Sequence, residues 1–205
     1  MVYPFTKLAI FPFFRLFIKE LSGLENIPAK GPFIIASNHE SYLDPMVICS
    51  VVIPKINRKI RFIAIRDAAQ RNFWKLGDVI CRKWAGCIPL DKADKGKGAL
   101  NEAITHLKNG EIVALFPEGE LTKKERKPRA GVARLALDSK APIIPIYLEN
   151  TAKVLPALKL KPKALKRIIR IRIGKPILWE QLEPKREDFG RIADDIIKRV
   201  YNLAK

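Results

Sequence analysis

Two short segments of the sequence hold side chains whose types and spacing suit acid–base chemistry. The first, residues 38–45, reads Asn-His-Glu-Ser-Tyr-Leu-Asp-Pro, so Asp44 follows His39 by five residues. With a helix beginning between them, the carboxylate lies about one turn away and reaches the imidazole. A neutral imidazole held in this way accepts a proton from a hydroxyl, and the carboxylate stabilises the cation. The spacing alone equally fits a loop histidine beside a helix cap, with Ser41 as the cap.

The second segment, residues 116–122, reads Phe-Pro-Glu-Gly-Glu-Leu-Thr. Here Glu118 precedes Gly119, and a glycine lets the backbone approach another group closely. Residues 123–129 then bring five cations and one acid into a single loop. Such a loop suits a phosphate ligand, but a solvated surface explains the same run of charges.

Both segments are predicted to follow buried strands, at Phe33–Ser37 and Glu111–Phe116, because each is preceded by a short apolar run. Strands that alternate with helices predict a single α/β domain, with a mostly parallel or mixed sheet flanked by helices and functional loops at strand ends. The other expected strands are Ile60–Ile65, Gly86–Leu90, Pro142–Leu148 and Ile168–Ile173, and the expected helices are Tyr42–Val52, Lys97–Asn109, Gly131–Lys140 and Arg186–Leu203.

The first 22 residues are predicted to form a membrane-surface helix ahead of the main domain at residues 23–205. Their longest uncharged apolar run, Leu8–Phe14, has seven residues, whereas a spanning helix needs about 20. No small-residue cleavage site follows, so no removable signal is expected. Aromatic residues with flanking cations suit a helix in the headgroup layer, and the alternative is a first helix packed on the core.

The net charge of +18 predicts attraction to an anionic partner. The segment Thr151–Lys175 contains nine Lys and Arg residues and no acid, which favours an anionic membrane surface. Nucleic acid is not an expected partner, because no ribonucleoprotein, helix-turn-helix or zinc-knuckle pattern occurs. Cys49, Cys81 and Cys87 are odd in number and lack ligand spacing, so neither a disulfide framework nor a metal site is expected. Reduced thiols fit a cytosolic setting.

Four blocks of the sequence, taken together, resemble the glycerolipid acyltransferase family typified by bacterial 1-acylglycerol-3-phosphate acyltransferases. Residues 38–44 fit the family's Asn-His-x-Ser-x-x-Asp block, which contains its HX4D motif. Residues 86–92, 116–119 and 141–146 resemble the second, third and fourth blocks in the family's order. Four blocks with sensible spacing are specific, although each alone is weak.

The resemblance implies an O-acyltransferase of phospholipid biosynthesis on the cytoplasmic face of a membrane, peripheral or monotopic. His39 would deprotonate the hydroxyl of a lysophospholipid acceptor such as 1-acylglycerol-3-phosphate, and Asp44 would orient His39. The hydroxyl would then attack the thioester of an acyl-CoA or acyl-carrier-protein donor, with no cofactor and no metal. Backbone amides near the first or third block are candidate oxyanion donors. A hydrolase on the same fold, in which His39 activates water, remains an alternative, whereas His106 is expected at the surface.

The sequence departs from the family in the acceptor site. The third block usually continues Thr-Arg-Ser, and its arginine is understood to bind the acceptor phosphate, but here the residues are Glu120, Leu121 and Thr122. Other cations therefore bind the phosphate, or the head group is different. The expected substrate-binding residues are Asn38, Ser41, Arg66, Lys92, Phe116, Pro117, Glu118, Gly119, Lys123 and Arg129.

Overall fold

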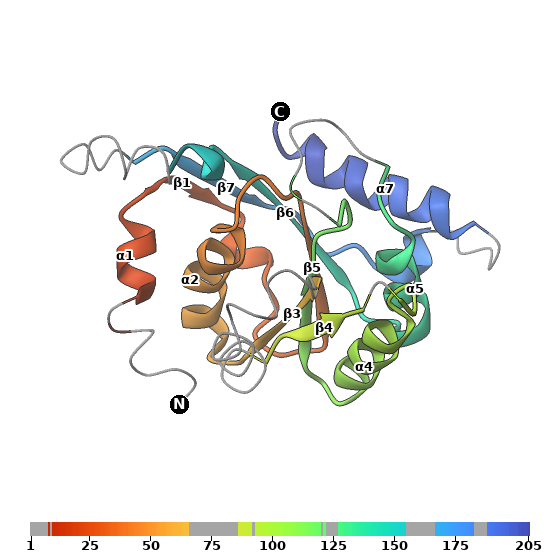
Figure 1. Cartoon of the computed structure of the whole chain (residues 1–205). Coiled ribbons are helices and arrows are strands. Elements are labelled where there is room, and N and C mark those ends of the chain that lie inside the picture. Colours follow the sequence, from red (N-terminus) through yellow and green to blue (C-terminus); the bar gives the residue numbers. More distant parts are fainter. Residues whose placement is uncertain are drawn as a thin grey trace.

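A seven-stranded sheet runs through the molecule and carries helices on both faces (Figure 1). The computed structural model describes residues 8, 10–65, 86–91, 93–119, 121, 127–154, 167–182 and 188–205. The strands are β1 (Ile18–Ser22), β2 (Phe33–Ser37), β3 (Ile60–Ile65), β4 (Ile88–Leu90), β5 (Ile112–Leu115), β6 (Ile143–Glu149) and β7 (Ile169–Ile173). The helices are α1 (Phe11–Arg15), α2 (Asp44–Ile56), α4 (Lys97–Lys108), α5 (Gly131–Ser139) and α7 (Phe189–Asn202), with 3₁₀ turns at Leu24–Asn26, Thr151–Lys153 and Trp179–Leu182.

The sheet is mixed, with the strand order β1-β7-β6-β2-β5-β3-β4. Only the β6–β7 pair among these strands is antiparallel, and the other neighbours run parallel. Strands that run in the same direction need crossover connections, and here α2 connects β2 to β3, α4 connects β4 to β5, and α5 connects β5 to β6. The prediction of an α/β domain with a mostly parallel or mixed sheet is confirmed.

Strand β2 lies in the middle of the sheet and is buried on both faces, as its uninterrupted apolar run predicts. Successive side chains on a strand point to opposite faces. Phe33 and Ile35 accordingly pack in the core under α1 and α2, while Ile34 and Ala36 pack in the core under α4, α5 and α7. Figure 1 shows these two groups of helices on opposite sides of the sheet.

The N-terminal segment differs from the predicted surface helix. Helix α1 has only five residues, and the chain then extends into β1, which pairs in parallel with β7. Phe11 and Phe17 are buried against the α2 side of the core, whereas Phe13 and Leu16 are exposed. Part of the segment therefore packs on the domain, as the alternative predicted. No helix among the described residues is long and apolar enough to cross a bilayer.

Part of the basic segment predicted to face a membrane is paired with acids. Arg170 and Arg172 on β7 lie within ion-pair distance of Glu149 on β6 and of Glu20 on β1. Adjacent strands place these side chains on one face of the sheet, so the charge of β7 is balanced locally. Residues 155–166, which hold four of the nine cations, lie outside the described residues.

Candidate active site

The two chemically promising segments meet at the ends of neighbouring parallel strands. Strands β2 and β5 pair so that Ala36 lies beside Leu115. Continuing this register by three residues places His39 beside Glu118 at the carboxyl edge of the sheet. The His39 backbone N–H donates to Glu118 Oε2 at 3.1 Å, which agrees with that register. Parallel pairing thus joins residues that are 79 positions apart in sequence.

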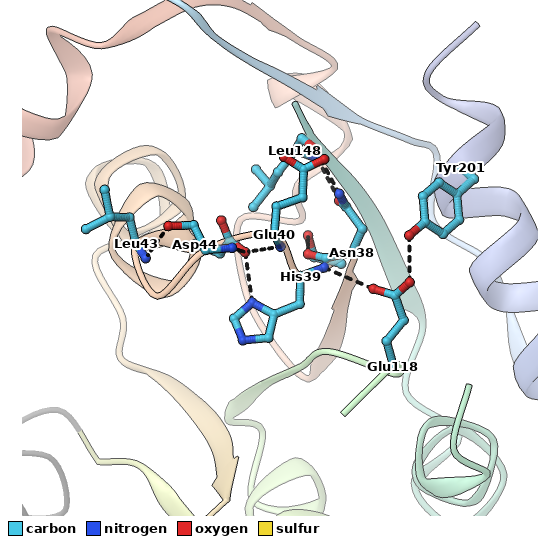
Figure 2. A network of polar contacts seen from close by, with 10 residues as sticks. Asn38, His39, Glu40, Leu43, Asp44, Glu118, Leu148 and Tyr201 are labelled. Carbon is cyan, nitrogen blue, oxygen red and sulfur yellow. Dashed lines mark hydrogen bonds and ion pairs between the residues drawn. The ribbon is translucent and has the colours of Figure 1, made fainter. Parts of the chain in front are cut away.

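His39 and Asp44 form the predicted pair (Figure 2). The distance from His39 Nδ1 to Asp44 Oδ2 is 2.8 Å. An ionised carboxylate only accepts hydrogen bonds, so Nδ1 carries the proton and Nε2 keeps its lone pair. Nε2 lies on the side of the ring that points away from Asp44, where it is free of that carboxylate and suited to take a proton from a hydroxyl.

The Asp44 carboxylate is held by the turn that starts α2. Its Oδ2 atom also accepts the backbone N–H groups of Glu40 at 2.8 Å and Ser41 at 2.9 Å. Asp44 is 0% exposed, and its Oδ1 atom has no hydrogen-bond partner among the described residues. A carboxylate in the first turn of a helix is favoured by the helix dipole. Burial and the Asp44 charge together raise the pKa of Glu40.

A stacked aromatic ring also holds the His39 imidazole in place. The Phe116 ring stacks on it, with ring centroids 3.9 Å apart and planes at 11°. Phe62 on β3 stacks in turn on Phe116, at 6.1 Å. An imidazole fixed by one hydrogen bond and one stacked ring has few other orientations available, so the His39 ring is preorganised.

Glu118 is a structural partner of the histidine loop. It is 4% exposed, and its two oxygens have different donors. Oε2 accepts the His39 N–H, and Oε1 accepts the Tyr201 hydroxyl of α7 at 2.6 Å. Sequence reasoning missed Tyr201. It lies next to the apolar stripe of an amphipathic helix, where nothing in the sequence pattern distinguishes it from a packing residue.

Asn38 and Ser41 make hydrogen bonds to the backbone of the protein and do not line the cavity described below. Asn38 is 1% exposed, and its side-chain amide exchanges two hydrogen bonds of 2.8 Å with the backbone of Leu148 on β6. The Ser41 hydroxyl accepts the Leu43 N–H at 3.2 Å. The structure therefore assigns both residues to the scaffold of the site, although the sequence predicted them as substrate ligands.

A cavity of about 880 Å³ opens beside His39. Pockets of this size suit a drug-sized or lipid-like ligand. Four of the residues predicted to bind substrate, Phe116, Pro117, Gly119 and Arg129, line it, whereas Glu118 does not. Three further cations on the lining were not predicted: Lys95, Lys97 and Arg134. Its apolar lining includes Phe62, Ile63, Leu90, Leu100, Leu115, Leu121, Val132 and Phe189. Arg66, Lys92 and Lys123 lie outside the described residues.

Four backbone amides of the first and third blocks already donate hydrogen bonds within the protein. Those of His39, Glu40 and Ser41 donate to carboxylates, and that of Gly119 donates to a backbone carbonyl. An amide with a good acceptor has no hydrogen left for a developing oxyanion. These four amides are therefore already paired, and the expectation that backbone amides near the first or third block supply the oxyanion donors stays a prediction for the others. No group of three or more metal-ligating side chains occurs in the described part of the chain.

Gly119 is required by its conformation and by its neighbour. Its φ is +79°, and an added Cβ would lie 2.6 Å from Arg129 Nε. Gly119→Ala is therefore expected to lower the free energy of unfolding by about 1–3 kcal/mol and to displace Arg129 from the cavity. Urea unfolding checks the first effect. Gly190→Ala is the control, because a Cβ there meets nothing within 4 Å. Equal stability of the two variants would contradict the expectation.

Comparisons with known proteins agree with this geometry. Residues 19–149 match the acyltransferase family. The 1-acyl-sn-glycerol-3-phosphate acyltransferase of Bacillus subtilis is 26% identical over 87% of this chain and 84% of its own length. A chloroplastic 1-acyl-sn-glycerol-3-phosphate acyltransferase of Brassica napus is 28% identical over 73% of this chain, but the match spans only 42% of that relative.

A solved structure shares the whole architecture. The 1-acyl-sn-glycerophosphate acyltransferase of Thermotoga maritima superposes with a TM-score of 0.67 and 24% identity, over 98% of this chain and 80% of that one. The matched family region, residues 19–149, contains both strands that carry the site and the His39–Asp44 pair. Because that match covers more than half of the sequence, this chain belongs to the acyltransferase family.

Proposed function

We propose that this protein transfers a fatty acyl group from an acyl thioester, acyl-CoA or acyl-carrier protein, to the free hydroxyl of a lysophospholipid in phospholipid biosynthesis. The observation that carries the proposal is the 2.8 Å contact between His39 Nδ1 and Asp44 Oδ2 beside a large, partly apolar cavity. The names of the relatives support 1-acylglycerol-3-phosphate as the first acceptor to test. The proposed chemistry needs no cofactor.

In the proposed reaction, His39 Nε2 removes the proton of the acceptor hydroxyl as its oxygen bonds to the thioester carbonyl carbon. The negative charge of Asp44 stabilises the imidazolium that forms. When the tetrahedral intermediate collapses, the carbon–sulfur bond breaks, and the imidazolium returns the proton to the leaving thiolate. The products are an ester and a free thiol, and His39 is neutral again.

The acceptor's phosphate is proposed to bind the cations of the cavity lining. Arg129 passes over Gly119, close to the turn that contacts His39. Lys95, Lys97 and Arg134 line the same cavity. Leu121, at the position where the family usually has arginine, lines it too. A guanidinium binds a phosphate through two parallel hydrogen bonds, so Arg129 is the strongest single candidate.

An acceptor screen tests the function directly. Purified protein receives one long-chain acyl-CoA and a panel of lysophospholipids with different head groups, and mass spectrometry identifies the products. The proposal expects a diacyl product with at least one acceptor. Release of free fatty acid at the same rate with and without acceptors would instead support the hydrolase.

Leu121 is expected to report on the acceptor head group. If the natural acceptor carries a bare phosphomonoester, Leu121→Arg should maintain or improve its use, because the new guanidinium adds a phosphate ligand. If the natural head group is larger, the same change should lower its use relative to 1-acylglycerol-3-phosphate. Competition between two acceptors in one reaction measures the ratio. An unchanged ratio would show that residue 121 does not contact the head group.

The exposed apolar residues beside α1 are proposed to contact a membrane at its cytoplasmic face. Leu16→Glu should weaken binding to vesicles that contain phosphatidylglycerol, because a charge replaces apolar surface in the headgroup layer. Leu178→Glu is the matched control, since Leu16 is 50% exposed and Leu178 is 48% exposed. Vesicle sedimentation measures the bound fraction. Equal binding by the two variants would contradict the proposal.

A further inference from the structure

The last turn of the C-terminal helix reaches the histidine loop. Helix α7 packs across β2 and β6, and Tyr201 projects from it toward Glu118 (Figure 2). The Tyr201 hydroxyl donates to Glu118 Oε1 at 2.6 Å, and Glu118 Oε2 accepts the His39 backbone N–H at 3.1 Å. One carboxylate thus links α7 to the backbone of the histidine.

The Tyr201–Glu118 hydrogen bond has the features of a strong one. A hydroxyl that donates to a carboxylate at 2.5–2.7 Å is charge-assisted, and such bonds are about twice as strong as neutral ones. Glu118 is buried, so few waters can replace a lost donor. Burial and the Glu118 carboxylate raise the pKa of the Tyr201 phenol, which keeps its proton throughout the pH range in which imidazole acts as a base.

The Tyr201 ring is itself held in place. The Tyr147 ring of β6 packs against it edge to face, with centroids 5.9 Å apart and planes at 61°. This contact fixes the direction in which the hydroxyl points. Tyr201 lies well beyond residues 19–149, the part of the chain that matches the acyltransferase family, so the four sequence blocks do not include it.

We propose that Tyr201 is a positioning residue for the reaction, acting on His39 through Glu118. Without the hydroxyl, Glu118 Oε1 would lack its donor in a buried place, and the carboxylate would rotate toward another donor or toward water. That rotation would move Oε2 away from the His39 N–H. The backbone of His39 would then be less restrained, and the direction of its imidazole less well defined. The inference rests on the proposed acyl transfer, in which small displacements of the base slow the chemical step.

Tyr201→Phe is the first test, because it removes the hydroxyl and keeps the ring. We expect kcat to fall roughly tenfold, the worth of one hydrogen bond to a charged group, while KM for both substrates changes by less than about twofold. Tyr147→Phe is the matched control: it removes the neighbouring phenol hydroxyl and leaves the Tyr201–Glu118 bond intact. A normal kcat in Tyr201→Phe, or an equal fall in Tyr147→Phe, would overturn the proposal.

A double-mutant cycle tests the route through Glu118. In a Glu118→Ala background, the hydroxyl has no carboxylate to hold, so adding Tyr201→Phe should change kcat by less than about twofold. Thermal unfolding of each variant shows that it is folded. A further tenfold fall in the double variant would mean that Tyr201 acts by some other route, and the proposal would be wrong.

Proton NMR tests the positioning role of Tyr201 without an acyl-transfer assay. The chain has two histidines, so His106→Ala identifies which downfield imidazole N–H signal belongs to His39. Tyr201→Phe should shift or broaden that signal, and Tyr147→Phe should leave it unchanged. An unaltered signal in Tyr201→Phe would overturn the positioning role. If Tyr201→Phe altered the His39 signal but the wild-type protein transferred no acyl group, the proposed function alone would fail.

Discussion

Replacing the histidine of the proposed catalytic pair is expected to have the largest effect on activity. His39→Ala should lower kcat by roughly 10²–10⁴-fold, the usual contribution of a positioned general base. KM should change little, because the imidazole acts mainly in the transition state. The hydrogen bond to Asp44 and the stacking on Phe116 hold the ring without using Nε2. Steady-state kinetics with acyl-CoA and the best acceptor measure both constants.

The other histidine provides the control for this experiment. His106 lies on α4, with its ring nitrogens 3.7 Å from Glu102 and 3.5 Å from Glu111, and it does not line the cavity. His106→Ala should leave kcat within about twofold of wild type, as expected for a residue outside the site. Near-normal acyl transfer by folded His39→Ala would show that the proposed mechanism is wrong.

Asp44→Asn is expected to separate the charge of the carboxylate from its shape. The amide oxygen can still accept from the Glu40 and Ser41 N–H groups that now bind Oδ2. The negative charge that stabilises the imidazolium is lost, so kcat should fall by roughly 10²–10⁴-fold. Combined with His39→Ala it should add little, because two residues that act as one unit are not additive.

Asp44→Ala should lose stability as well as activity. It leaves the buried Ser41 N–H without its acceptor, and an unsatisfied buried group costs about 1–3 kcal/mol. Urea unfolding of the two Asp44 variants should therefore show Asn as the more stable. Asp195→Asn is the control. The ion pair between Asp195 and Arg199 is half-exposed, and such pairs contribute little to the free energy of unfolding. Equal stability of Asp44→Asn and Asp44→Ala would contradict this account of the turn.

Strands β2 and β3 could be predicted from local sequence, each from a different pattern. The predicted strands at Phe33–Ser37 and Ile60–Ile65 have the bounds of β2 and β3. The apolar run of β2 predicts a fully buried strand, and the alternation in β3 predicts a strand with one face more exposed, so neither prediction depended on knowing the neighbours. The predicted helix Tyr42–Val52 was misplaced by a few residues, because the observed helix begins at Asp44 and continues through Pro54 to Ile56.

The strand β1 could not be predicted, because its own side chains do not define it. Ile18–Ser22 has two partly buried and three exposed residues, two of the latter being Lys19 and Glu20. That pattern suits a surface helix as well as an edge strand. The chain becomes a strand here because the edge of β7 offers it unpaired backbone groups.

For the site, the sequence by itself determined the candidate acid–base pair. A histidine and an aspartate five residues apart, between an apolar strand and a helix, can meet through local backbone geometry alone. The Phe-Pro-Glu-Gly turn after a second strand was equally visible. The sequence also indicated that the acceptor site departs from the family, since Leu121 replaces a cation.

Only the tertiary structure decided which residues surround that pair and what each one does. The β2–β5 register brings Glu118 to the His39 backbone, and α7 brings Tyr201 to Glu118. The Asn38 side-chain amide is hydrogen-bonded to the Leu148 backbone. These contacts join residues 79, 83 and 110 positions apart. No local pattern predicts such partners, because they depend on the order of the strands and the packing of the helices. These in turn depend on how the apolar side chains of the whole chain are buried together in the core.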